Sequence, residues 1–157
     1  MNQDEARHDA ARAGRFSVRV LRHADPADFD LLLDLRARVL RPGQPKQRSH
    51  FPGDDAPGAV HLGAFVGERL VGIATVTEEN GLRLRGMAVE DDARCRGVGA
   101  ALVHRVCAVA IERNAPLWCN ARAAAVGFYE KLGWVVEGEQ FDMPDIGPHF
   151  RMRWRPA

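Results

Sequence analysis

The stretch LRLRGMAVEDDARCRGVGAALVHRVCAVAIER, residues 82–113, decides how the rest of the chain folds. Residues 82–89 first alternate between apolar and other residues and then become continuously apolar, a pattern that predicts a buried strand. The acidic residues 90–92 interrupt that pattern as a turn. From Val98 onward, apolar residues recur at a spacing near 3.6, which predicts a helix of about four turns that begins at or just after Gly97.

The junction between this strand and this helix has the features of a phosphate-binding site. The first N–H groups of a helix have no partner inside it, and the aligned peptide dipoles place partial positive charge there. Gly97 and Gly99 lack a Cβ atom, so a ligand can approach their backbone closely. Arg94 and Arg96 add two full positive charges. The pattern therefore indicates binding of a phosphate or pyrophosphate group, with a glycine-containing helix start that holds no ligand as the alternative.

The motifs of nucleotide-binding proteins do not fit this junction. It has no Gly-Lys-Ser/Thr for a nucleoside triphosphate, and no third glycine in the dinucleotide-binding spacing. It resembles instead the acyl-CoA-binding motif of the GNAT N-acetyltransferases, Arg/Gln-x-x-Gly-x-Gly/Ala, which Arg94, Gly97 and Gly99 match in position. The resemblance extends over most of the chain from about Phe16 to Trp154.

Two further segments carry the same resemblance. The segment AVGFYEKLGW, residues 125–134, is similar to the A-x-x-F-Y-x-K-x-G-F signature of the GNAT family. The piece Gly147-Pro148-His149-x-x-Met152 is similar to the Gly-Ile-Pro-His-x-x-Met ending of its ElaA-like subfamily, with Gly-Pro where that subfamily has three residues before the histidine.

Composition indicates one ordinary domain. A chain of 157 residues that is 46% hydrophobic can bury a core without disulfides or metals. Its net charge of +1 argues against a general nucleic-acid or membrane-surface binder. The three cysteines show no CxxC spacing, which indicates reduced thiols in a cytoplasmic protein and no metal site. No apolar run approaches the roughly 20 residues of a membrane span.

The remaining patterns predict the order of the elements. Residues 1–14 are polar and alanine-rich and are expected to form a disordered leader, followed by a single GNAT-like domain over residues 15–157. Asp25 and Pro26 are typical of a helix N-cap and first position. The predicted helices are residues 26–39, 98–113 and 123–132, and the predicted strands are residues 16–21, 60–66, 70–77, 82–89, 117–120 and 134–141.

The expected fold class is α+β with three layers, an acyl-CoA N-acyltransferase fold as the resemblance implies. Its sheet is expected to be mixed and mostly antiparallel, with about six to seven strands flanked by helices. The helix at 98–113 separates the strands at 82–89 and 117–120, so these two strands are expected to be parallel. In the resembled fold, those two strands splay apart and the acyl-pantetheine arm inserts between them. Gly86 is either a bulge at that point or a packing glycine.

The resemblance implies that acetyl-CoA serves as the acyl donor, without a metal. A backbone N–H late in the strand at 82–89 is expected to hydrogen-bond the thioester carbonyl. One position departs from the family: many members have asparagine seven residues before the helix tyrosine, where this chain has Arg122. The expected cofactor-binding residues are Met87, Ala88, Val89, Arg94, Arg96, Gly97, Val98, Gly99, Ala100, Asn120, Arg122 and Phe128.

The long polar segment from Arg41 to Gly58 is expected to be either functional or mobile. In the resembled family this region shapes the acceptor side, so Arg38, Arg41, His50 and Phe51 are candidate substrate residues. The alternative is that they are solvated residues of a loop.

Tyr129 and His149 are the candidate catalytic residues. Tyrosine has an unperturbed pKa near 10, so Tyr129 could donate a proton to a departing thiolate; the alternative is a core aromatic side chain on an amphipathic helix. His149 is a candidate base or substrate residue, with a hydrogen-bonded structural histidine as the alternative. Carboxylates that could act as the base through water are Glu79, Glu90, Glu139 and Asp142.

The sequence thus favours an acetyl-CoA-dependent N-acetyltransferase acting on a primary amine of a small molecule or peptide. The alternatives are a catalytically silent acyl-CoA-binding sensor or interaction module, and a protein that holds another phosphate-bearing ligand in the same loop. Homodimerisation is common in the resembled family, but no stretch of the sequence identifies an interface or the acceptor.

Overall fold

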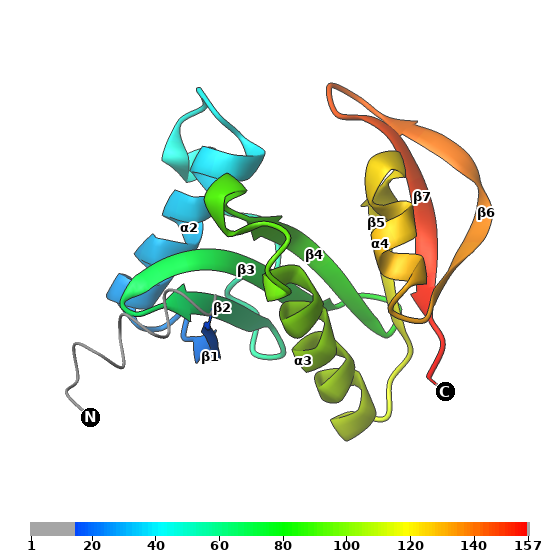
Figure 1. Cartoon of the computed structure of the whole chain (residues 1–157), viewed down its shortest axis with the longest axis horizontal. Helices are drawn as coiled ribbons and strands as arrows, with labels where there is room; N and C mark the ends of the chain where they lie inside the picture. Colours follow the sequence, from blue (N-terminus) through cyan, green and yellow to red (C-terminus); the bar gives the residue numbers. More distant parts are fainter. Residues whose placement is uncertain (1–14, 157) are drawn as a thin grey trace.

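The computed structural model describes residues 15–156, which form a seven-stranded sheet in the order β1-β2-β3-β4-β5-β7-β6 (Figure 1). The expected leader, residues 1–14, lies outside the described residues. Neighbouring strands are antiparallel except for β4 and β5, which are parallel. The predicted fold class and the predicted parallel pair are therefore confirmed. The strands are β1 (Ser17–Leu21), β2 (Val60–Val66), β3 (Arg69–Glu78), β4 (Leu82–Val89), β5 (Leu117–Arg122), β6 (Trp134–Met143) and β7 (Gly147–Trp154).

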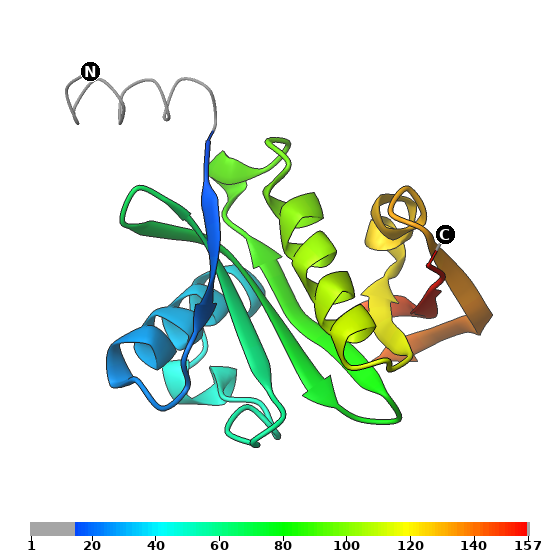
Figure 2. The same cartoon turned by 90° about the horizontal axis from the view of Figure 1, so that it is seen from below.

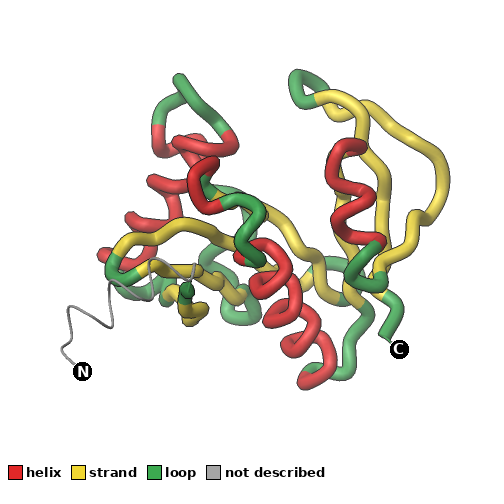
Figure 3. Tube along the Cα trace, in the orientation of Figure 1, coloured by secondary structure: helices red, strands yellow, loops and turns green. Residues whose placement is uncertain are grey.

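Three α-helices and three short 3₁₀ helices complete the described chain (Figure 3). They are α2 (Pro26–Leu40), α3 (Val98–Glu112), α4 (Val126–Glu130), η1 (Lys46–Ser49), η2 (Asp91–Ala93) and η3 (Ala123–Ala125). Within residues 15–156, no helix is long and apolar enough to cross a membrane.

The helix boundaries follow the local sequence at α2 and α3. The side chain of Asp25 accepts a hydrogen bond from Ala27 N at 2.9 Å, as the N-cap prediction requires. The α3 helix begins at Val98, with Gly97 in the left-handed conformation at its N-cap. The prediction of one helix over residues 123–132 is wrong in extent, because the chain forms η3 and then only a short α4. At its end, Leu132 N–H bonds Tyr129 O, which tightens the last turn.

The two long helices cover opposite faces of the sheet (Figure 2). One apolar cluster joins α3 to the sheet and contains the fully buried Leu102 and Val106. The other joins α2 to the sheet and contains Leu32, Leu35 and Ile73. Each fully buried aliphatic side chain of this kind contributes about 1.5–3 kcal/mol by leaving water, so the two clusters fix both helices against the strands.

A β-bulge in β4 reverses which residues face each helix. Leu84 belongs to the cluster under α3, whereas Ala88, also at an even position, belongs to the cluster under α2. The register explains the change: Ile73 opposes Ala88 and Thr75 opposes Arg85, so two residues of β4 stand opposite one residue of β3. One extra residue moves every later side chain to the other face. The predicted alternative of a bulge at Gly86 is therefore confirmed.

Gly86 is required at the bulge by both conformation and space. Its φ is +61°, in the region that side chains other than glycine rarely adopt. A Cβ atom there would lie 3.2 Å from Arg36 Nε and 3.3 Å from Phe51 Cε2. Any larger residue would push against a buried arginine.

Pairing between β4 and β5 is short. Only Leu82, Arg83 and Leu84 of β4 pair with β5, opposite residues 117–119. Beyond that point the two strands diverge, and β5, β7, β6 and α4 stand apart from the first four strands (Figure 1). The sheet is therefore open between its two central strands at their carboxyl ends.

A fully buried arginine anchors the long segment between α2 and β2. Arg36 donates to both carboxylate oxygens of Asp54, at 2.6 and 3.0 Å, to Ser49 O at 2.9 Å and to Thr75 Oγ1 at 2.8 Å. Burial raises the pKa of Asp54, but hydrogen bonds and charge from Arg36 outweigh it, so this pKa lies below its ordinary value. His61 completes the cluster, bonding Thr75 Oγ1 through Nδ1 and Asp54 O through Nε2.

We predict that Arg36→Met lowers the free energy of unfolding by about 3–5 kcal/mol, because it leaves the Asp54 carboxylate buried without its partner. Urea denaturation of the purified protein measures the change. Arg38→Met is the matched control, since Arg38 lies on the same helix and pairs with Glu90, but its side chain is 48% exposed. The control should lose less than about 1 kcal/mol. A loss of equal size in the two variants would contradict the anchoring role of Arg36.

Candidate active site

The opening between β4 and β5 contains a cavity of about 770 Å³. Its walls come from the end of α2, the segment after it, β4, β5, α4 and the turn between β6 and β7. A cavity of this size is sufficient for a small-molecule ligand. The predicted site residues that line it are Arg41, Phe51, Met87, Asn120, Arg122, Phe128, Tyr129 and His149.

The predicted phosphate-binding loop, residues 94–100, which is called the phosphate loop below, lies beside this cavity. A Cβ atom added to Gly99 would lie 3.2 Å from Phe128 Cζ and 3.5 Å from Met87 Cε, two side chains that line the cavity. The start of α3 is therefore adjacent to the cavity, although Arg94, Arg96, Gly97, Val98, Gly99 and Ala100 are outside its lining. Ala88 and Val89, at the end of β4, are also outside the lining.

The N-terminus of α3 presents free backbone donors. Its N-cap residue, Gly97, supplies no side-chain hydrogen bond, and the first N–H to find an acceptor in the helix is that of Ala101, which bonds Gly97 O at 3.0 Å. The N–H groups of residues 98–100 therefore have no helical acceptor. Gly97 has a φ of +82°, with open space where its Cβ would lie. This arrangement is suited to an anion.

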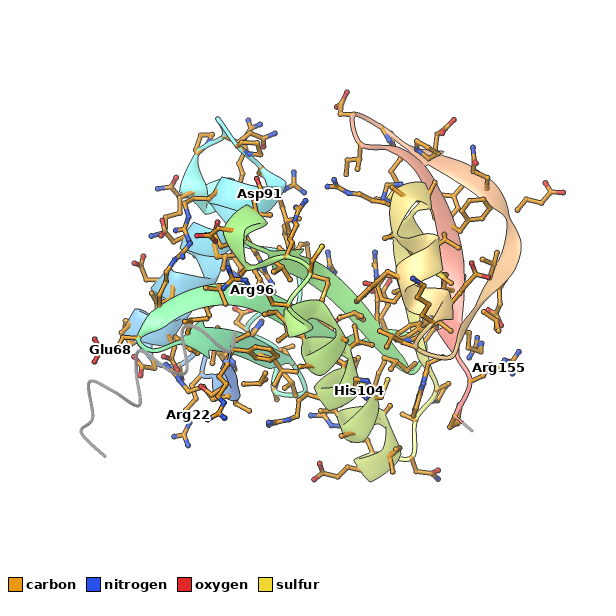
Figure 4. The ribbon with its side chains drawn as sticks, in the orientation of Figure 1. Arg22, Glu68, Asp91, Arg96, His104 and Arg155 are labelled. Atoms are coloured by element: carbon orange, nitrogen blue, oxygen red, sulfur yellow. The ribbon has the colours of Figure 1, made fainter. Side chains whose placement is uncertain are left out.

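The two arginines of the loop differ in their surroundings. The guanidinium of Arg94 lies 3.3 Å from Asp91 Oδ1, and its Nε donates to Val89 O at 3.4 Å. Arg96 is exposed and makes no ion pair with any residue in the described part of the chain. Figure 4 labels Asp91 and Arg96 on the segment that leads into α3. Arg96 is therefore the arginine available to an incoming anion.

Tyr129 lies at the wall of the cavity with its ring packed in the core. It is 6% exposed, and its ring centroid lies 5.2 Å from that of Trp134 and 5.1 Å from that of Phe128. Burial raises the pKa of Tyr129 far above its ordinary value. The hydroxyl therefore stays protonated over the whole physiological range and can act only as a proton donor or hydrogen-bonding group.

His149 enters the cavity from β7, in register with Arg122 of β5. Its Nδ1 lies 2.8 Å from Gly147 O. A carbonyl oxygen only accepts, so Nδ1 carries the proton in this contact and Nε2 is the ring nitrogen that can accept one. The position suits either a base or a structural histidine.

Several predicted residues lie elsewhere. Arg38 pairs with Glu90 and Asp34 and is outside the cavity lining. The His50 ring packs against Phe29 at 5.4 Å and is likewise outside it. None of the four candidate carboxylates, Glu79, Glu90, Glu139 and Asp142, lines the cavity. The acidic residue of the described chain that does line it is Asp145, in the β6–β7 turn.

Sequence reasoning missed a group of cavity residues. Arg83 and Arg85 of β4 line the cavity beside Gly86, as do Arg48 and Cys119. The alternation L-R-L-R at residues 82–85 already indicates that both arginines share the face opposite Leu82 and Leu84. Burial raises the pKa of Cys119 to about 12, so its thiol is neutral.

The sheet thus opens between two parallel strands, beside a helix start whose first N–H groups have no helical acceptor. Residues 44–156 match the acetyltransferase (GNAT) domain family. The chain belongs to the GNAT acetyltransferase family, and it is an acetyl-CoA-dependent N-acetyltransferase of that type.

Known proteins resemble the chain in sequence and in fold. It is 38% identical over 128 residues to the uncharacterised N-acetyltransferase YitI of Bacillus subtilis (strain 168), covering 76% of this chain and 86% of YitI. Its fold matches ElaA of Escherichia coli with a TM-score of 0.72 at 19% identity, covering 89% of this chain and 99% of ElaA. An aminoglycoside 6'-N-acetyltransferase in complex with coenzyme A matches with a TM-score of 0.73 at 17% identity, covering 90% and 99% of the two chains.

We predict that Gly97→Ala weakens CoA binding. The substitution forces a side chain into a left-handed conformation and costs about 1–2 kcal/mol of stability, and it distorts the N–H groups at the start of α3. The measurement is the shift in thermal unfolding temperature with CoA. Gly138→Ala is the matched control, because Gly138 has a φ of +77° and equally open surroundings on β6. Equal CoA-induced shifts in the two variants would contradict the role of this loop.

Proposed function

We propose that the chain transfers the acetyl group of acetyl-CoA to a primary amine of a small molecule or peptide, with Tyr129 as the general acid. The observation that carries this proposal is the position of Tyr129, a permanently protonated hydroxyl on the wall of the cavity where β4 and β5 diverge. The family relationship supports acetyl transfer, and the geometry supports the assignment of this residue.

The loop residues fit a pyrophosphate group. The free N–H groups of residues 98–100 point out of the start of α3, Gly97 leaves its Cβ space open, and Arg96 adds an unpaired charge. Asn120, Arg122 and Phe128 line the cavity next to this loop and are proposed to contact the rest of the cofactor. Acetyl-CoA supplies a thioester, whose acyl carbon is activated towards attack and whose leaving group is a thiolate.

The backbone of β4 beyond the bulge supplies donors for the thioester carbonyl. Because β5 pairs with β4 only as far as Leu84, the groups of residues 85–89 that point toward β5 have no strand partner. An N–H of Met87, Ala88 or Val89 is proposed to hold the carbonyl oxygen as negative charge develops on it. The bulge in β4 and the loop at the start of α3 together then position the acyl group, and much of the rate enhancement of acetyl transfer comes from this positioning.

Tyr129 and His149 are proposed to move the two protons of the reaction. The Tyr129 hydroxyl, at the wall of the cavity, donates its proton to the departing sulfur as the C–S bond breaks, and the tyrosinate left behind regains a proton from water. His149 Nε2 accepts the proton released by the amine, while its Nδ1–H stays bound to Gly147 O. His149 replaces a carboxylate in this role because the four candidate carboxylates lie outside the cavity.

We predict that Tyr129→Phe lowers kcat about 100-fold and leaves the KM for acetyl-CoA nearly unchanged. The phenylalanine ring keeps the packing against Trp134, so folding should be preserved. Release of free CoA thiol with a panel of primary amines measures turnover. In the same assay, His149→Gln should lower kcat and leave the KM for acetyl-CoA nearly unchanged. Turnover that is unchanged in Tyr129→Phe would exclude Tyr129 as the acid.

A further inference from the structure

The cavity wall is strongly basic. Five arginines line it and a single acidic residue faces them: Arg41, Arg48, Arg83, Arg85 and Arg122 against Asp145. The whole chain, by contrast, has a net charge of only +1. Arg83 is paired with Glu79 at 3.0 Å, so the four other arginines carry the excess of positive charge at this site.

Phe51 contacts two of these arginines. The guanidinium carbons of Arg41 and Arg85 lie 5.4 and 5.2 Å from the centre of its ring, within the range of cation–π contacts. The buried Arg36 stacks on the same ring at 4.1 Å and is neutralised by Asp54. Neither Arg41 nor Arg85 forms an ion pair with a carboxylate of residues 15–156. Two positive charges thus contact one aromatic ring, and neither has an anionic partner among residues 15–156.

Arg85 lacks polar partners despite being half-buried. Its Nη1 donates only to Pro52 O, at a long 3.4 Å, and its Nε is buried without any hydrogen bond in the described structure. Burial lowers the pKa of Arg85, and the positive charge of Arg83 lowers it further, while the carboxylates of Asp54 and Glu79 act in the opposite direction without reversing the shift. A buried charge is costly without a partner, so an anion placed here would be bound strongly.

These arginines lie on the acceptor side and are separate from the phosphate loop. Leu82 and Leu84 face α3, so Arg83 and Arg85, at the alternate positions before the bulge, face the α2 side of the sheet. The start of α3, with its free N–H groups, lies on the opposite face. An anion at Arg85 is therefore a different group from a pyrophosphate held at the start of α3.

We propose that the acceptor is a small primary amine that also carries an anionic group, a carboxylate or a phosphate, which binds between Arg41 and Arg85. The proposal rests on the proposed function and specifies its substrate class. The planar fork of arginine matches carboxylate and phosphate oxygens and forms paired hydrogen bonds with them. Polycationic amines are disfavoured, because the same arginines repel them.

The test compares matched pairs of amines that differ in one anionic group. The pairs are β-alanine with β-alaninamide, and 2-aminoethyl phosphate with 2-aminoethanol, with a polycationic aminoglycoside as a further acceptor. We expect kcat/KM to be at least about tenfold higher for the anionic member of a pair. The preferred pair distinguishes carboxylate from phosphate. Equal values within both pairs, or a preference for the neutral or polycationic amines, would overturn the proposal.

Variants assign the preference to the arginines. Arg85→Gln should remove the preference for the anionic amine and leave the KM for acetyl-CoA unchanged, whereas Arg85→Lys should retain part of it. Arg41→Gln provides a second variant, at the other cavity arginine that contacts Phe51. Arg155→Gln is the control, because Arg155 is 62% exposed and lies at the C-terminal end, away from the opening (Figure 4). An unchanged preference in both Arg85→Gln and Arg41→Gln would place the anion elsewhere.

A binding measurement separates this proposal from the proposed function. The thermal unfolding temperature of the protein saturated with CoA is measured with succinate and with inorganic phosphate, at constant ionic strength. We expect one of these anions to raise the unfolding temperature. Arg85→Gln should abolish this rise, and Arg155→Gln should leave it unchanged. If no amine is acetylated but the rise is present, acetyl transfer fails and the anion site stands. If neither anion raises the unfolding temperature, the anion site is refuted, whether or not the protein acetylates an amine.

Discussion

The short parallel contact between β4 and β5 is the constraint on which the rest of the structure depends. Three residue pairs hold the two halves of the sheet together, and Trp118 Nε1 reinforces this end by donating to Glu79 O at 2.7 Å. The bulge at Gly86 comes two residues after the last of these pairs, and it moves the later side chains of β4 to the other face of the sheet. The strands can then diverge, which opens the cavity and leaves backbone donors of β4 without a strand partner beside the start of α3.

The buried cluster around Arg36 links the stability of the fold to the wall of the cavity in this opening. Arg36 forms an ion pair with Asp54, and Asp54 Oδ2 accepts a hydrogen bond from Phe51 N at 2.7 Å. The backbone of Phe51 is therefore fixed by the buried ion pair. Phe51 in turn places Arg41 and Arg85 at the cavity wall. Only glycine at position 86 leaves room for this arrangement. The segment after α2 is thus an ordered part of the site, positioned by a buried ion pair.

Sequence patterns could predict the elements whose cause is local. The N-cap at Asp25, the start of α3 after Gly97 and the parallel crossover to β5 all follow from spacing and residue type. The role of Arg36 could not be predicted, because a charged residue within a helix is normally solvated and its partner Asp54 lies 18 positions away. The place of Arg85 at the cavity wall depends on the end of the β4–β5 pairing after Leu84, which alternation alone cannot locate. Strand β7 also lacked a pattern of its own, since its Gly-Pro start and basic residues hide the pairing with β5 and β6.

Hydrogen exchange of backbone amides, with and without CoA, tests the central claim most directly. If CoA binds in the opening between β4 and β5, it should slow exchange at residues 98–100, at the start of α3, and at residues 87–89, beyond the bulge. Amides of β6, on the outer edge of the sheet, should be unaffected. Protection confined to the second cavity, of about 450 Å³ between the end of α3 and the C-terminal residues 153–156, would contradict the account, because CoA would then bind away from the opening between β4 and β5.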